Sequence, residues 1–140
     1  MATLKISDLS VGDWVEFMGE LCKVLDCGTT IVTPRTLEFK PRLTLSAKYD
    51  IYDCVDVDKV TPIPITAEIL GKSGFVKNGE YNEWSTGNWD DIPFIGISLS
   101  RQSMRIKNLG TDIFIENKVV YIHQLQHALR LAGIDKEINL

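Results

Sequence analysis

The sequence predicts an α+β fold: an N-terminal SH3-like small β-barrel, residues 1–61, packed against an antiparallel sheet with two short helices, residues 62–140. Three observations lead to this prediction. Short β-prone runs separated by glycine and proline fill most of the chain. Two segments show helical signals, one in the middle of the chain and one near its end. Long crossover helices between strands, which a parallel sheet requires, are not indicated.

The first lobe begins with Val11-Gly12-Asp13, which resembles the triplet before the first strand of small SH3-like barrels. We expect a strand over Trp14–Met18, a tight turn at Gly19-Glu20, and a second strand that Gly28 ends. Further β-prone runs follow at Ile31–Thr33, Thr36–Leu45 and Tyr49–Val60.

The run Tyr49–Val60 alternates between apolar and polar residues. The alternation places Ile51, Val55 and Val57 on one face, and Asp53 breaks it, which predicts a bulge or a strand end. Several aspartates occupy the other face, but without calcium-loop spacing, so we expect a solvated face there and no metal.

The boundary between the lobes is predicted at Pro62-Ile63-Pro64, because two closely spaced prolines force an extended segment. Thr66 then has the position of an N-cap for a helix over Ala67–Ser73, and Gly74 lies where a helix C-terminus needs a positive φ.

The second lobe continues with β-prone runs. Asn78-Gly79 predicts a hairpin, and Ser85–Ile92 a polar loop. In the run Ser103–Leu109 we expect Met104 and Ile106 to point inward. The other predicted strands are Phe75–Lys77, Glu80–Trp84, Phe94–Leu99, Ile113–Ile115 and Val119–Tyr121.

A closing helix is predicted over Tyr121–Gly133. Its apolar stripe consists of Ile122, Leu125, Leu129 and Ala132. His123, His127 and Arg130 share another flank. A zinc helix would carry a glutamate between its histidines, and Arg130 would repel a cation, so we expect a polar flank and no metal site. A contact surface is the alternative, because Leu131 lies off the stripe.

Composition limits the functional classes. The 140 residues carry a net charge of −4 and the pI is about 5.1, which disfavours wrapping of nucleic acid by bulk charge. The chain has no apolar run of membrane-spanning length and no secretory signal at its start, so we expect a cytoplasmic protein. Its three cysteines, Cys22, Cys27 and Cys54, are expected to be free and mostly buried. Nucleophile-elbow and phosphate-loop motifs are absent, so we predict no cofactor, and an enzyme is the least supported class.

Two features are candidate binding surfaces. Trp84 and Trp89 lie among acidic residues, and tryptophans in such a place either plug a core or form a contact. Arg101, Arg105 and Lys107 project from one face of a strand in a segment without acids, which favours contact with phosphates or an acidic partner. A solvated surface is the alternative for both.

Three segments resemble a group of short uncharacterised proteins that phages, prophages and mobile elements of gut bacteria encode. They are the opening Val11–Val15, the central Pro62–Phe75 (PIPITAEILGKSGF), and the tail beginning at Tyr121 (YIHQLQHALRLAGI). The resemblance implies a phage or mobile-element origin, and thus a bacterial host cell, but no activity.

Three functional hypotheses follow. The first is a non-enzymatic binding or adaptor protein with a protein partner from host or phage. The second is a nucleic-acid-binding accessory protein that uses the barrel and the basic strand face. The third is a small-molecule binder, for instance of a nucleotide signal, which would need a concave pocket.

Overall fold

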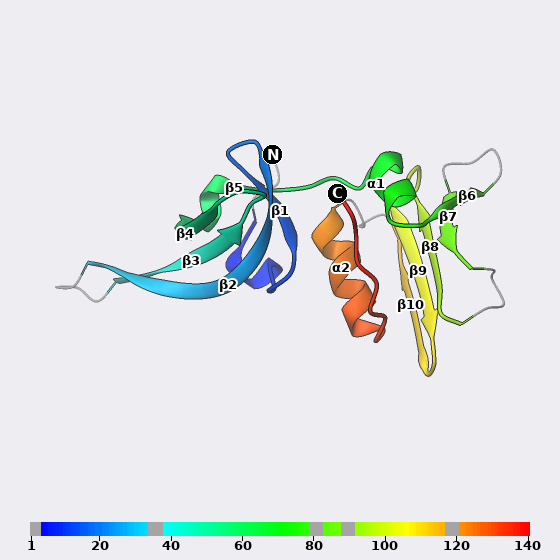
Figure 1. Ribbon diagram of the computed structural model, residues 1–140. Coiled ribbons are helices and arrows are strands. Elements are labelled where there is room, and N and C mark those ends of the chain that lie inside the picture. The colour runs from blue at the N-terminus through cyan, green and yellow to red at the C-terminus, as the bar shows by residue number, and fades with distance from the viewer. Residues whose placement is uncertain (1–3, 34–37, 79–82, 88–91, 117–120) are drawn as a thin grey trace. The chain divides into compact units, whose positions relative to one another are not determined.

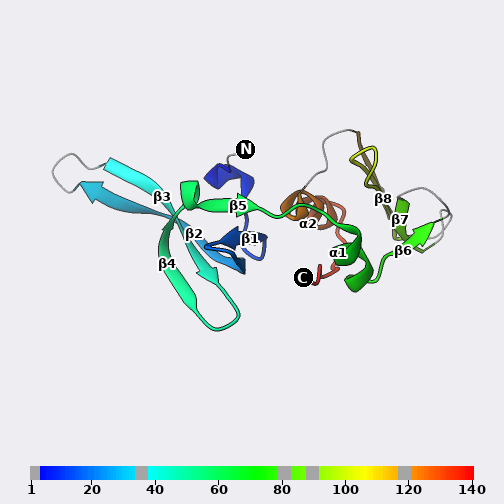
Figure 2. The same ribbon diagram turned by 90° about the horizontal axis from the view of Figure 1, so that it is seen from above.

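The computed structural model describes residues 4–33, 38–78, 83–87, 92–116 and 121–140, with only the backbone described for 29–33 and 38–40. The fold is α+β, with two five-stranded antiparallel sheets and two α-helices (Figures 1 and 2). The chain divides into two compact units, residues 1–63 and 64–140. The division falls two residues after the boundary expected at 61/62, because the last strand of the first sheet includes Pro62. The predicted packing of one lobe against the other stays a prediction.

The first unit contains one sheet with the strand order β4-β3-β2-β1-β5. Its elements are the short 3₁₀ helix η1 (Ile6–Asp8), β1 (Trp14–Phe17), β2 (Glu20–Thr33), β3 (Glu38–Ser46), β4 (Ile51–Asp56), the 3₁₀ helix η2 (Val57–Lys59) and β5 (Val60–Pro62). The predicted first hairpin is confirmed, but its turn is Met18-Gly19, one residue earlier than the expected Gly19-Glu20. Phe17 pairs with Glu20, and the two turn residues both have positive φ. Within the described residues β4 and β5 remain the sheet edges, and no closed barrel is found.

The expectation that Gly28 ends its strand is wrong. Gly28 continues β2 and pairs with Arg42, in a long hairpin with β3. Its φ is not positive, so nothing in its backbone interrupts the ladder. Pro41 fits inside β3 because β4 pairs with β3 only from Arg42 onward, which leaves one side of the proline without a partner strand.

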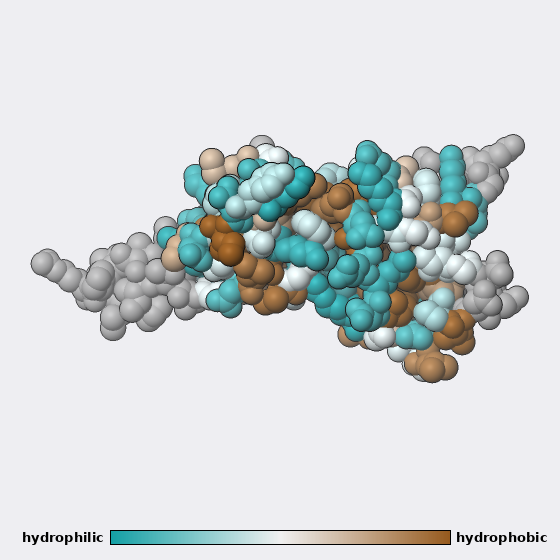
Figure 3. Space-filling model, viewed as in Figure 1, coloured by the Kyte–Doolittle hydropathy of each residue, from teal (hydrophilic) through white to brown (hydrophobic). Residues whose placement is uncertain are grey.

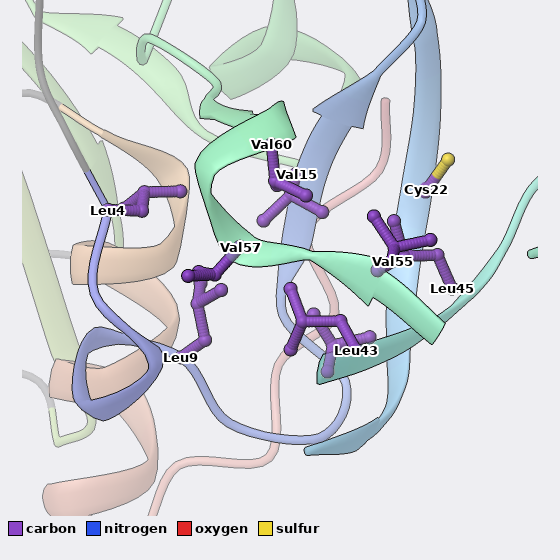
Figure 4. Close-up of a cluster of buried hydrophobic side chains, with 10 residues drawn as sticks. Leu4, Leu9, Val15, Cys22, Leu43, Leu45, Val55, Val57 and Val60 are labelled. Carbon is purple, nitrogen blue, oxygen red and sulfur yellow. The ribbon is translucent and has the colours of Figure 1, made fainter. Parts of the chain in front are cut away.

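The core of the first unit is formed by ten buried residues (Figure 4). Val55 and Val57 belong to it as predicted, but Ile51 does not, since its side chain is 64% exposed. The register between β3 and β4 shifts where Leu43 faces Val55 and Leu45 faces Tyr52, and Cys54 there has a φ of 55°. The extra residue reverses the alternation before it. The predicted irregularity near Asp53 is therefore confirmed, and it explains the wrong placement of Ile51.

The second unit contains a sheet with the order β10-β9-β8-β7-β6 and both α-helices. Its elements are α1 (Ala67–Lys72), β6 (Val76–Asn78), β7 (Glu83–Thr86), β8 (Phe94–Ser98), β9 (Ser103–Asn108), β10 (Thr111–Ile115) and α2 (Ile122–Leu131). The helix signals of α1 are confirmed. The hydroxyl of Thr66 accepts a hydrogen bond from the backbone N–H of Ile69 at 3.3 Å, and Gly74 has a φ of 88°. The hairpin of β6 with β7 is confirmed, but Asn78, which was expected in its turn, belongs to β6 and pairs with Glu83. Residues 79–82 between the two strands lie outside the described residues, as does the predicted strand start at Val119.

Both helices of the second unit lie on the same side of its sheet (Figures 1 and 2). The predicted stripe of α2 is buried, and Met104 and Ile106 point inward as expected. The polar-flank prediction is wrong for His123, which is only 6% exposed and stacks on Tyr121 with ring centroids 5.9 Å apart. The last residues return to α1, where the backbone N–H of Asn139 donates to the hydroxyl of Ser73 at 2.9 Å. No helix in the described part of the chain is both long and apolar enough to cross a membrane.

Candidate functional site

The second sheet has two different faces. Cross-strand pairing places Ile97 beside Met104 and Ile95 beside Ile106, and these side chains form the buried inner face. The alternate residues of the same strands form what we call the outer face. The outer face contains a hollow of about 460 Å³, which is open to solvent. Its lining comes from β6–β10 and from the β8–β9 turn, which carries Arg101.

The floor of the hollow is made of small residues from three neighbouring strands. Ser85 pairs with Gly96, and Ser98 pairs with Ser103, so the four positions lie together in the middle of the outer face. A Cβ atom at Gly96 would lie 3.1 Å from the ring of Phe94 on the same strand. The aromatic ring therefore lies against the glycine, and the missing side chains leave the depression.

One wall of the hollow contains Arg105, which forms an ion pair with Asp112 across β9 and β10. The Arg105 guanidinium donates to both oxygens of the Asp112 carboxylate, from Nη2 at 2.8 Å and from Nε at 3.2 Å. These hydrogen bonds lower the pKa of Asp112 and raise that of Arg105. The guanidinium carbon also lies 5.7 Å from the centroid of the Phe114 ring. The polar and aromatic groups of this wall thus hold one another in place.

The predicted basic face is therefore less basic than its sequence indicates. The segment itself has no acid, but the neighbouring strand supplies Asp112, which faces Lys107 in the register and binds Arg105. Arg101 and Arg105 line the hollow, whereas Lys107 lies on the same face opposite Phe94 and is not among the lining residues. The binding role expected for these three residues stays a prediction.

The rim of the hollow carries three further charged side chains. Arg101 is exposed, and its backbone N–H donates to the Ser98 hydroxyl at 3.3 Å, which fixes the turn. Glu83 and Glu116 are exposed as well, and within the described part of the chain neither forms an ion pair. Because Arg105 and Asp112 neutralise each other, the charge that remains among the described lining residues is two carboxylates against one guanidinium.

Trp84 lies on β7, in agreement with the predicted strand Glu80–Trp84, whereas Ser85 and Thr86, which were expected to be in a loop, belong to the same strand. In the register Trp84 is paired with Ile97, so it belongs to the inner face, although it also borders the hollow. A Cβ atom at Gly71 of α1 would lie 3.9 Å from Cζ3 of its ring, and its Nε1 is buried with no hydrogen-bond partner among the described residues. The half-buried ring near α1 supports the core-plugging alternative, and the binding role expected for Trp84 stays a prediction. Trp89 lies outside the described residues.

The other candidate groups form no site in the described part of the chain. No three metal-ligating side chains come together there. The three cysteines are free, as predicted, but only Cys22 is buried, and Cys54 is exposed. Burial raises the pKa of the Cys22 and Cys27 thiols, which makes them poor nucleophiles. Asp56 forms an ion pair with Arg42 at 3.2 Å.

On the side of the molecule that Figure 3 shows, the described hydrophobic residues do not gather into one surface. In the view of Figure 3, hydrophobic and hydrophilic residues alternate over both units, and a hydrophobic residue ends the β9–β10 turn. Leu109 at this turn is exposed. The hollow is thus the feature that combines a concave shape with both polar and aromatic side chains.

Comparison with protein-family models, with curated proteins and with solved structures found no match to the chain.

Proposed function

We propose that the chain is a non-enzymatic binding protein, of phage or mobile-element origin, that holds its ligand in the hollow on the outer face of the second sheet. The observation that carries the proposal is the hollow itself. Its volume of about 460 Å³ lies within the range of about 300–1,000 Å³ that is usual for ligand sites. A concave surface with a few convergent polar groups is the common form of such sites.

The residues of the hollow favour binding over catalysis. The described lining contains no histidine, cysteine or lysine, and none of the hydrogen bonds of its serine hydroxyls is to a glutamate that could act as a base. The hydroxyl of Ser98 has the Ser100 hydroxyl and the backbone N–H of Arg101 as its neighbours, and neither is a base. The Ser85 hydroxyl accepts a hydrogen bond from the Asn78 amide at 2.6 Å.

The first unit would then serve as a scaffold or adaptor. Its four-strand meander, with β5 returning to β1 after η2, supports an SH3-like small barrel. The free cysteines support residence in the cytoplasm of a bacterial host. Binding of nucleic acid is less well supported, because the chain has an acidic pI and because Asp112 neutralises Arg105, one of the cations of the basic face.

The proposal can be tested by NMR with a variant that fills the hollow. A library of free amino acids, short peptides, mononucleotides and monosaccharides is titrated into ¹⁵N-labelled protein. We expect saturable shifts at the amides of Gly96, Ser98 and Arg105. Ser103→Phe, which places a ring on the floor, should abolish these shifts. Val76→Phe is the matched control, since Val76 lies exposed on the same face but is not among the lining residues.

Two outcomes would contradict the proposal. One is a library without a single compound that shifts the hollow amides. The other is equal loss of binding in Ser103→Phe and Val76→Phe, which would mean that the hollow does not hold the ligand.

A further inference from the structure

We propose that the ligand of the hollow is a neutral carbohydrate, bound through one sugar ring. The inference rests on the proposed function and names the chemistry of its ligand. It follows from three properties of the described lining, namely an exposed aromatic ring, a mixed set of hydrogen-bond donors and acceptors, and a charge that opposes phosphates.

The aromatic ring belongs to Phe114, whose side chain is 57% exposed although it lies on a sheet. In the register Phe114 pairs with Arg105, and the guanidinium near the ring is held in turn by Asp112. Because the guanidinium lies over one face of the ring, a ligand in the polar hollow would stack on the other face. One face of a pyranose presents C–H bonds, which pack well on the negative face of an aromatic ring. The exposed ring would thus be covered by the sugar.

The polar groups around the Phe114 ring match a ligand with many hydroxyls. Each sugar hydroxyl both donates and accepts, so it needs partners of both kinds. Glu83 and Glu116 only accept, Arg101 only donates, and the serine hydroxyls of the floor do both. Hydrogen bonds from hydroxyls to carboxylates are charge-assisted and stronger than neutral ones, which favours orientation of a ring among these groups.

The charge of the described lining disfavours a nucleotide as the ligand. A nucleotide would bring at least one phosphate toward Glu83 and Glu116, and Arg101 is the one cation on the described lining that no carboxylate neutralises. A basic peptide would be attracted by Glu83 and Glu116, so it is the competitor that the test has to separate from a sugar. An apolar segment would bury the Ser103 hydroxyl without a partner. A neutral polyhydroxylated ring brings no phosphate toward the carboxylates and offers hydrogen bonds to the floor.

The test uses the full chain and named probes. Glucose, galactose, mannose and N-acetylglucosamine are titrated separately into ¹⁵N-labelled protein. AMP, which represents nucleotides, and the peptide Gly-Lys-Gly, which represents basic peptides, are titrated in the same way. We expect at least one sugar to shift the amides of Gly96, Ser98 and Phe114 in a saturable way. Neither AMP nor the peptide should shift these amides at equal concentration.

Variants then assign the contacts. Phe114→Ala should weaken sugar binding at least tenfold, and Glu83→Gln several-fold. Leu109→Ala removes an exposed apolar side chain from the same hairpin, outside the hollow, and should leave the affinity unchanged. Unchanged amide chemical shifts in the strands between the sheet edges, β7–β9, away from the substitution, show that each variant is folded.

The results separate the inference from the function beneath it. If AMP or the peptide binds the hollow and no sugar does, the carbohydrate inference is wrong and the binding function stands. If a sugar binds but Phe114→Ala binds it equally well, the stacking argument is wrong and so is the inference. If no probe shifts the hollow amides, both proposals fall.

Discussion

Leu129→Ala tests whether α2 closes the second unit through the stripe that the sequence predicts. The Leu129 side chain is 2% exposed, and that of Leu131, two residues further along the same helix, is 77% exposed. The two substitutions remove the same atoms and change helix propensity equally. The difference between them therefore isolates the effect of burial.

The magnitude follows from the atoms removed. Leucine to alanine deletes three carbon groups, which at about 0.8 kcal/mol each gives a transfer loss of about 2.4 kcal/mol. Incomplete collapse of the site adds a cavity term, so the total for a buried leucine lies between about 2 and 5 kcal/mol. At Leu131 the side chain is already in water, and we expect a change below about 0.5 kcal/mol.

The assay is urea unfolding followed by tryptophan fluorescence. Because the chain has two units, the two transitions have to be separated. A Trp14→Phe background removes the tryptophan of the first unit, so that Trp84 and Trp89 report on the second. Equal shifts of the unfolding midpoint for Leu129→Ala and Leu131→Ala, at equal slope, would refute the assignment of the buried stripe.

Three further predictions concern local features. Thr66→Ala should destabilise the second unit by about 1 kcal/mol through loss of the α1 N-cap, and Thr66→Asn should restore most of it; chemical denaturation measures both. NMR titration should place the pKa of Asp112 below that of an ordinary aspartate, and Arg105→Gln should raise it again. Because the pKa of Asp112 is lower in the folded than in the unfolded chain, the ion pair stabilises the fold at a pH above the unfolded-state pKa. This stabilisation is lost as the pH falls through the folded-state pKa. Iodoacetamide near neutral pH should modify Cys54 first and Cys22 last, and mass spectrometry that finds equal rates would contradict the burial of Cys22.

Features that depend on a few neighbouring residues could be predicted from the sequence. Thr66 and Gly74 bound α1 because an N-cap and a positive φ are local requirements. The stripe of α2 and the inward side chains of β9 follow from periodicity alone. Such signals do not depend on what the rest of the chain does.

Predictions that depended on which residue of another segment lies beside a given side chain were less accurate. The alternation in β4 holds on each side of the irregularity, but a single extra residue moved Ile51 to solvent. His123 is on the flank where the helical wheel places it, yet the wheel does not show that Tyr121 stacks on it. In the same way the basic segment around Arg105 contains no acid, and its neutralising carboxylate comes from the next strand.

The hollow could not be predicted because it exists only through register. Its floor combines Ser85, Gly96, Ser98 and Ser103, which are unremarkable in their own segments and meet only when β7, β8 and β9 align. A shift of β9 by one residue would replace Ser103 and Arg105 on the outer face by Met104 and Ile106. The hydrophobic inner face prevents that shift, because it would expose two buried side chains. The packing that stabilises the second unit is therefore also what forms the hollow. If the hollow binds a ligand as we propose, a substitution on the inner face of β9 should impair binding by misaligning the strands, without a contact to the ligand.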